Sequence, residues 1–247
     1  MKSFAIKITL AILAFMMLAM LAIPGASADD IARSVAISAG TSESIDINGD
    51  GLDEIIMLTE VADGLLMMID YPNGTQFEAT LPCPPNCVIK RIGAAQLVGG
   101  VAQDIAVLAH DNETERNYVY LIDTESPDVF IKMPSYTDPY FQYRVSFSRN
   151  FLLEIQNRSE SLFVNVTLPV EVFEPLYRDD GSAPGALTAS FGDFEDMRVE
   201  YIGSSNVLTL IQYVYITVLD EPIARVESTL ASRDDGVTLI RQRVLAE

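Results

Sequence analysis

Hydrophobic residues in this chain come in short runs of about six to eight residues, separated by small polar turns. The first clear runs are Glu54–Glu60, Leu65–Pro72 and Thr75–Leu81, with Asp63-Gly64 and Asn73-Gly74 between them. Asp-Gly and Asn-Gly pairs between β-rich runs are typical of hairpins. No stretch has a sustained helical period with caps. The pattern therefore predicts an all-β chain.

Similar runs continue to the end of the sequence. The further predicted strands are 34–37, 88–97, 118–123, 129–133, 143–147, 151–156, 162–168, 207–219, 223–230 and 237–245. The segment 173–196 is different, because its prolines, Asp-Gly pair and acidic run predict a long connection. His110, the only histidine, follows an apolar run and is predicted to lie in a loop.

The pattern also repeats. QLVGGVAQDIAVL, from Gln96, aligns without a gap on DINGDGLDEIIML, 50 positions earlier, and a weaker third copy is VEYIGSSNVLTLI, from Val199. Each copy has a glycine-containing turn followed by an apolar strand. Repeats of this period are typical of propeller blades. We therefore expect a β-propeller-like array of degenerate repeats of about 50 residues, with four or five blades. A β-sandwich, with a chance likeness between the copies, is the alternative.

The first copy contains the segment with the most specific chemistry, DINGDGLDE, residues 46–54. Oxygen-bearing side chains recur there at alternate positions, and a hard cation such as Ca²⁺ takes six to eight oxygen ligands. Gly49 and Gly51 allow the tight turn that this needs. The predicted metal ligands are Asp46, Asn48, Asp50, the carbonyl oxygen of Leu52, and Glu54.

Two other interpretations of this segment are an EF-hand and an Asx-rich turn without a metal. An EF-hand needs a bidentate Glu at its twelfth position and a helix after it, but Met57 occupies that position and an apolar strand follows. An Asx-rich turn without a metal is the remaining alternative, because such residues form good hairpins unaided.

The segment DINGDGLDEII resembles the calcium turn of the FG-GAP or VCBS repeat of integrin-like β-propellers. Asp46, Asn48, Asp50 and Glu54 match that family's ligand positions, with Glu in place of the final Asp. The match covers about a dozen residues. The resemblance implies a secreted propeller that binds calcium and takes part in extracellular interaction or adhesion.

The N-terminus has the features of a secretion signal. Two lysines precede the apolar run Ile8–Ile23, and Ala26-Ser27-Ala28 forms an A-x-A cleavage site. The run has 16 residues, fewer than the roughly 20 that span a bilayer. We expect a signal peptide at 1–28 and one secreted or cell-envelope β-repeat domain at 29–247, with no membrane span after cleavage. An uncleaved anchor is the alternative.

Charge and cysteine content restrict the partners. The chain has 16 Lys and Arg against 35 Asp and Glu, a net charge of −19, which disfavours nucleic acid and attracts cations. Cys83 and Cys87, in LPCPPNC, are predicted to form a small-loop disulfide after export, with free buried thiols as the alternative. A zinc site would need more His or Cys ligands than the chain has.

The sequence contains no G-x-S-x-G motif, no phosphate-binding P-loop and no dinucleotide-binding glycine turn. We therefore expect a non-catalytic, calcium-binding module whose partner is an extracellular protein or glycan. A calcium-dependent extracellular hydrolase or lyase acting on polysaccharide, and a structural envelope component, are the alternatives.

Overall fold

The computed structural model describes residues 31–97, 103–125, 137–174, 177–178, 180–182, 188–202, 205–216, 219, 221–233 and 236–247. In these residues antiparallel strands dominate, and α2 (Val170–Phe173) is one helical turn. The prediction of an all-β chain is confirmed. The predicted signal peptide lies outside the described residues. None of the helices in the described part is long and apolar enough to cross a membrane.

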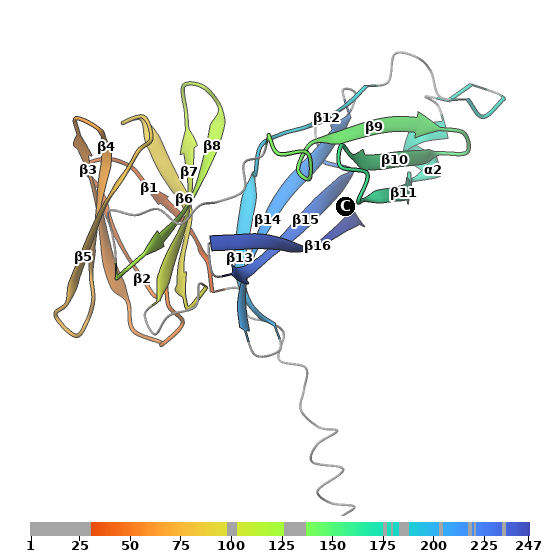
Figure 1. Ribbon diagram of the computed structural model, residues 1–247. Helices are drawn as coiled ribbons and strands as arrows, with labels where there is room; N and C mark the ends of the chain where they lie inside the picture. The colour runs from red at the N-terminus through yellow and green to blue at the C-terminus, as the bar shows by residue number, and fades with distance from the viewer. Residues whose placement is uncertain are drawn as a thin grey trace, which may run out of the picture.

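The strands of the described residues form four sheets (Figure 1). Sheet 1 has the order β2 (Ser42–Ile45), β3 (Glu54–Val61), β4 (Gly64–Asp70), β5 (Gln76–Leu81). Sheet 2 has the order β1 (Arg33–Ile37), β6 (Cys87–Ala95), β7 (Asp104–Asp111), β8 (Arg116–Asp123). Sheet 3 has the order β12 (Ala189–Phe191), β14 (Ser205–Ile216), β15 (Ala224–Arg233), β16 (Gly236–Ala246), and β13 (Asp196–Ile202) also pairs with β14. Sheet 4 has the order β11 (Phe163–Thr167), β10 (Leu152–Asn157), β9 (Tyr143–Ser148).

Most predicted strands are present, with small shifts at their ends. The short strand β2 was not predicted, and β12 lies inside the expected connection 173–196. The predicted strand 129–133 lies outside the described residues. The prediction for His110 was wrong: it lies in β7, paired with Asn117 of β8, because that hairpin continues to Asp111.

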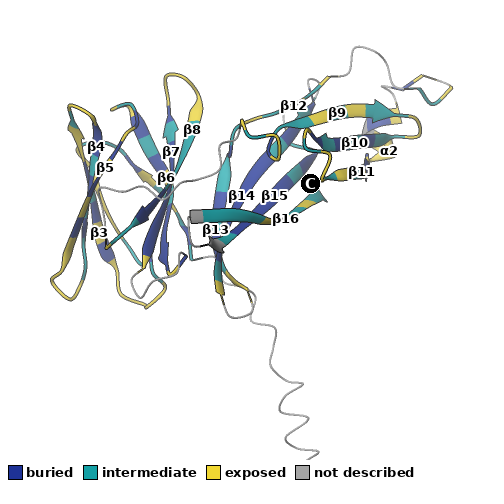
Figure 2. Cartoon of the chain, viewed as in Figure 1, coloured by how far each residue is buried: buried dark blue, intermediate teal, exposed yellow. Residues whose placement is uncertain are grey.

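The sheets pack face to face through three hydrophobic cores. Sheets 1 and 2 share the first core, sheets 2 and 3 the second, and sheets 3 and 4 the third. Since successive side chains of a strand point to opposite faces, β7 supplies two cores: Ile105 and Val107 belong to the first, and Ala106 and Leu108 to the second. All four are fully buried. Figure 2 shows this burial running through the strands, with the exposed residues mainly in the loops.

The hairpins β2–β3 and β6–β7 pair in the same register. Ile45 pairs with Glu54, and 50 positions later Ala95 pairs with Asp104. The remaining pairs of β2 and β3 have counterparts at the same offset in β6 and β7. The alignment of the first two copies therefore corresponds to equivalent positions in two neighbouring sheets.

The third copy keeps the same register in sheet 3. Val199 pairs with Leu208, the positions that follow Ala95 and Asp104 by 104 residues. Here pairing continues to Ile202 and Ser205, so the eight-residue loop of the first copy is replaced by a longer hairpin. The repeat therefore survives as a pairing register even where its loop has changed.

Cys83 lies two residues after the end of β5, and Cys87 is the first residue of β6. Both are buried in the first core and both are free thiols, so the structure does not contain the disulfide that we predicted. Burial raises the pKa of both thiols, and that of Cys87 reaches about 12. They behave as small apolar core side chains, which was the alternative interpretation.

Candidate functional site

The loop between β2 and β3 contains four of the five predicted metal ligands, and the fifth, Glu54, is the first residue of β3. Two glycines shape the loop. Gly49 and Gly51 have φ values of 76° and 86°, which residues with a Cβ adopt at a cost. The Asp46 carboxylate accepts from the Gly49 N–H at 2.6 Å and from the Gly51 N–H at 3.0 Å. Burial acts to raise the pKa of Asp46, but these hydrogen bonds lower it below its usual value. Asp46 is therefore held as a carboxylate inside the turn.

Asn48 lies between the other carboxylates of the loop. Its Nδ2 donates to Asp50 Oδ2 at 3.2 Å and to Glu54 Oε1 at 3.0 Å. Its Oδ1 accepts from the Asp50 N–H at 2.9 Å, and Asp50 Oδ1 accepts from the Leu52 N–H at 2.8 Å. The partial positive charge of one amide nitrogen thus lies between two acidic side chains.

Glu54 is completely buried at the base of the loop. Its Oε2 accepts from the Ile47 N–H at 3.0 Å. Burial raises the pKa of Glu54, and the nearby charges of Asp50 and Asp46 add to the effect. No ion pair found in the described part of the chain involves Glu54. The donors that contact it in the described residues, the Ile47 N–H and the Asn48 amide, are both neutral.

The second repeat keeps this buried acid. Asp104, the counterpart of Glu54, is 4% exposed, and its Oδ2 accepts from the Leu97 N–H at 2.9 Å. Seven residues separate donor and acceptor in both repeats. The third repeat has the buried Leu208 at this position, within the second core. The acid therefore fixes the end of the loop in two copies, whereas the other predicted ligands occur only in the first.

A cavity of about 540 Å³ opens beside the first loop. Its wall includes Asn48, Asp50, Leu52 and Glu54, which are four of the five predicted ligands. Tyr71 also lines it, and burial, with the Glu54 charge, raises the pKa of Tyr71 to about 12. Its hydroxyl therefore keeps its proton at neutral pH and can donate a hydrogen bond. Among the described residues, the lining includes no Lys, Arg or His.

The predicted ligands lie in one turn, but their side-chain oxygens are occupied by hydrogen bonds within that turn. In the part of the chain that the structure describes, no three His, Cys, Asp or Glu side chains are placed to hold a metal ion. The loop oxygens instead accept from N–H groups of the loop itself. The chemistry of the set still suits a hard cation, because every candidate ligand is an oxygen and the buried carboxylate lacks a basic partner.

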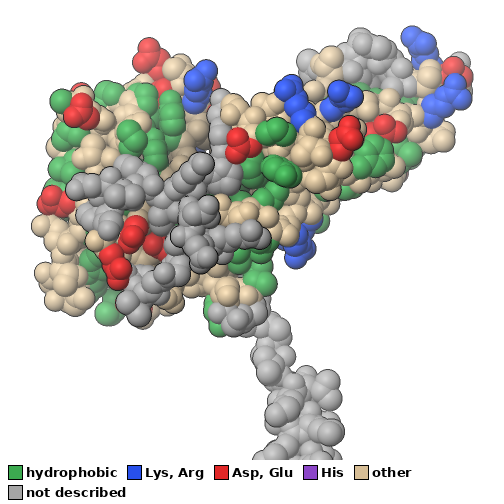
Figure 3. Space-filling model, viewed as in Figure 1, with side chains coloured by type: hydrophobic (Ala, Val, Ile, Leu, Met, Phe, Trp, Pro, Cys, Tyr) green, Lys and Arg blue, Asp and Glu red, His purple; other side chains and the backbone are tan. Residues whose placement is uncertain are grey.

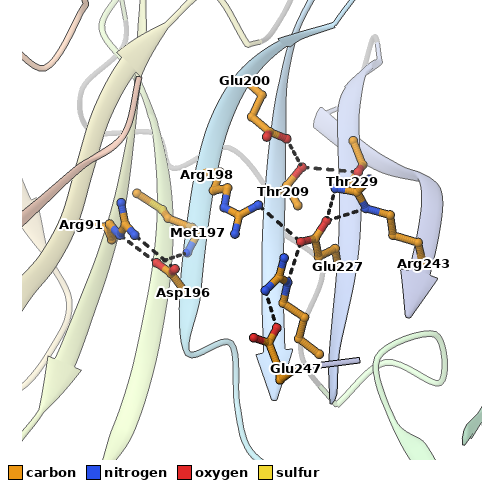
Figure 4. A network of polar contacts seen from close by, with 11 residues as sticks. Arg91, Asp196, Met197, Arg198, Glu200, Thr209, Glu227, Thr229, Arg243 and Glu247 are labelled. Atoms are coloured by element: carbon orange, nitrogen blue, oxygen red, sulfur yellow. Dashed lines mark hydrogen bonds and ion pairs between the residues drawn. The ribbon is translucent and has the colours of Figure 1, made fainter. Parts of the chain in front are cut away.

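An arginine network on sheet 3 is a second polar feature, and the sequence analysis did not find it (Figure 4). Glu227 on β15 is 1% exposed and forms ion pairs with Arg198 of β13, Arg225 of β15 and Arg243 of β16. Burial acts to raise the pKa of Glu227, but these arginines lower it. They come from three strands, so only strand pairing brings them together.

Ion pairs connect the strands of sheet 3 to one another, and one further ion pair connects sheet 3 to sheet 2. Arg91 of β6 pairs with Asp196 of β13, with 2.8 Å between Nε and Oδ1. On the face drawn in Figure 3, most visible Lys and Arg side chains lie over the half of the molecule with sheets 3 and 4. Since the buried Glu227 and the partly exposed Asp196 both have basic partners, the network is a structural one.

Comparisons of the chain with protein-family models, with curated proteins and with solved structures found no match. The resemblance of residues 46–56 to a calcium turn is therefore an argument from those residues alone.

Proposed function

We propose that this chain is a secreted, non-catalytic, propeller-like binding module whose β2–β3 loop is ordered by calcium. Its role would be extracellular interaction or adhesion. The observation that carries the proposal is the segment from Asp46 to Glu54, in which the carboxylates of Asp50 and of the buried Glu54 both accept from one neutral amide, Asn48.

Calcium would compensate the electrostatic cost of that arrangement. Like charges at short range disfavour one another unless a cation neutralises them. Asp46, Asn48, Asp50, Glu54 and the Leu52 carbonyl would supply the oxygen ligands. For this, the Asn48 side chain would turn its Oδ1 toward the ion and withdraw its Nδ2. The ion would then fix the entry of β3 into sheet 1.

The propeller-like arrangement is supported by how the first two repeats stack. Ile56 and Leu58 of sheet 1 pack in the first core, whereas their counterparts Ala106 and Leu108 pack in the second. Equivalent faces of sheets 1 and 2 therefore point the same way, as in successive blades. Sheet 3 turns its equivalent face, with Leu210, back toward sheet 2. The blade-like order thus extends over two sheets, and a sandwich of these sheets is the competing description.

Thermal unfolding with and without calcium tests the site. If calcium binds only the native protein, a hundredfold excess over Kd raises the free energy of unfolding by about 2.7 kcal/mol. We expect this shift with calcium, little with magnesium, and almost none in Asp50→Ala. Asp53→Ala is the matched control, because Asp53 is an exposed acid of the same loop outside the predicted ligand set.

An equal calcium shift in Asp50→Ala and in the unchanged protein would refute the site. Absence of any shift would leave the loop as an Asx-rich turn.

A further inference from the structure

We infer that Asn73, in the turn between β4 and β5, carries an N-linked glycan, and that Asn157, which begins a second acceptor sequence, does not. The inference rests on one part of the proposed function, the export of the chain, because Asn-X-Ser/Thr segments are acceptors for such glycans in secreted proteins. It does not depend on the calcium site.

Acceptor sequences are more frequent in this chain than its composition predicts. An Asn-X-Ser/Thr segment begins at four of the nine asparagines, namely Asn73, Asn112, Asn157 and Asn165. Ser and Thr make up 32 of the 247 residues, so composition alone predicts about one such segment. None of the four has Pro at its middle position, which would abolish acceptance. The excess makes these segments candidates, and the structure separates them.

The chemistry of glycan transfer sets two requirements on the acceptor. The donor is an oligosaccharide joined through phosphate to a polyprenyl lipid. The Asn Nδ2 forms a bond to the anomeric carbon of the first sugar, and the bond from that carbon to the phosphate oxygen breaks, with its electron pair left on the phosphate. Nδ2 gives up one of its two protons. The fold must therefore leave space for a bulky group on Nδ2 and must not need both of its N–H bonds.

Asn73 meets both requirements. It is exposed, and so are the next two residues of its turn, Gly74 and Thr75. Its Oδ1 accepts from the Thr75 N–H at 2.8 Å and from the Thr75 hydroxyl at 2.6 Å, so the amide is held through its oxygen. Among the described residues, none accepts a hydrogen bond from Asn73 Nδ2. A sugar on this nitrogen would therefore replace no contact of the fold.

Asn157 meets neither requirement. Its side chain is 1% exposed, and its Nδ2 donates to the Ser161 hydroxyl at 2.8 Å, to Gln242 Oε1 at 3.1 Å and to the Tyr140 carbonyl oxygen at 3.5 Å. A sugar there would need space that the packed side chains occupy, and it would leave buried acceptors without a donor. The same sequence signal is therefore incompatible with modification in the folded protein.

The other two acceptor sequences are less well placed than Asn73. Asn112 is exposed, but its Nδ2 donates to the Asn86 carbonyl oxygen at 3.3 Å, and the Thr114 hydroxyl donates to a carboxylate at the end of β7. Asn165 is exposed but lies within β11, paired with β10, and not in a turn. Of the four, Asn73 alone combines an exposed turn with an unoccupied amide nitrogen.

Mass spectrometry of peptides from the protein isolated from its own host tests the inference. We expect an added mass on Asn73 that fragments as successive sugar units, and the unmodified mass for the peptide that contains Asn157. Asn73→Gln and Thr75→Val should abolish the addition, whereas Thr75→Ser should keep it, because a serine hydroxyl also completes the acceptor sequence. Asn86→Gln, at an exposed asparagine outside any acceptor sequence, is the control and should leave the addition unchanged.

The N-terminal peptide of the same sample separates this inference from the export on which it rests. If that peptide begins at Asp29 and Asn73 has no sugar, the inference is wrong and the export stands. If it begins at the first residue of the chain and Asn73 has no sugar, both are wrong. A sugar on Asn157, or on Asn112 or Asn165 while Asn73 is unmodified, would also overturn the inference. The thermal shift with calcium tests the calcium site independently of all these outcomes.

Discussion

At the scale of single residues, the β2–β3 loop depends on what lies between its carboxylates. In the structure that group is the Asn48 amide nitrogen, within hydrogen-bond distance of Asp50 and Glu54. An amide carries only a partial positive charge, so it balances these acids less well than a cation. The proposed calcium site therefore implies two forms of the loop, one closed by the amide and one closed by an ion.

Asn48→Asp should separate the two forms. Without calcium, the change removes the Nδ2 donor from two acceptors and adds a like charge, so we expect a loss of about 1–3 kcal/mol in unfolding free energy. With calcium, the extra charged ligand should raise the affinity. Urea unfolding in chelator and calcium titration measure the two effects. Asn112→Asp, at an exposed asparagine, is the control; greater stability of Asn48→Asp in chelator would contradict the prediction.

Glu54 should give the loop a pH dependence. Because burial raises its folded pKa, its favourable contribution to stability is complete below the usual Glu value of 4.5 and is lost as pH rises through the folded pKa. In chelator, the unfolding free energy of the unchanged protein should therefore fall with rising pH relative to Glu54→Gln. In calcium the trend should reverse, since the ion binds the deprotonated form. Parallel pH profiles of the two proteins in chelator would argue against a raised pKa.

At the scale of elements, hairpin glycines differ in what they tolerate. Gly64, the first residue of β4, has φ +144°, and a Cβ there would lie 2.0 Å from the Leu81 carbonyl oxygen. Gly74, between β4 and β5, has φ +83° with open space around its Cβ position. The first glycine is required by a close backbone approach, and the second only by its dihedral angle.

Gly64→Ala should consequently be much more harmful than Gly74→Ala. We expect Gly74→Ala to lower the unfolding free energy by about 1–2 kcal/mol, the usual cost of a left-handed conformation for a residue with a Cβ. Gly64→Ala adds displacement of the β5 backbone and should cost several times as much. Chemical denaturation of both variants checks this, and equal losses would show that sheet 1 accommodates the new methyl group freely.

The elements were also the level at which the sequence was most informative. Hairpin signals such as Asp63-Gly64 located β3 and β4 well, because the turn requirement is local. The candidate ligands of the loop could be named for the same reason, since they lie within nine residues, but their role stays a prediction. The Glu227 network, in contrast, joins strands that are far apart in sequence, and nothing local marks Arg198 as a partner. The free state of Cys83 and Cys87 likewise depends on their packing in the first core.

At the scale of the whole molecule, sheet 2 is the central layer, because sheets 1 and 3 cover its two faces. Leu108→Ala, in the core between sheets 2 and 3, should lower the unfolding free energy by about 2–5 kcal/mol. The loss should appear in one cooperative transition, because disordering sheet 2 uncovers both neighbours. Calorimetry checks the transition. Ile55→Ala is the control, because the Ile55 side chain on the outer face of sheet 1 is 46% exposed. A separate early transition for sheet 1 would contradict the prediction that the layers unfold together.

The hydrogen bond from a backbone N–H to an acid seven residues later has a consequence for recognising such chains. The first and second repeats share this bond. The second repeat lacks the other oxygen-bearing side chains that were predicted to bind a cation in the first. A search pattern weighted on the aspartates would find only the first repeat. A pattern built on an apolar residue, an acid seven places on, and alternating apolar positions after it would detect both, and would trace this architecture into sequences that have lost every other trace of the loop.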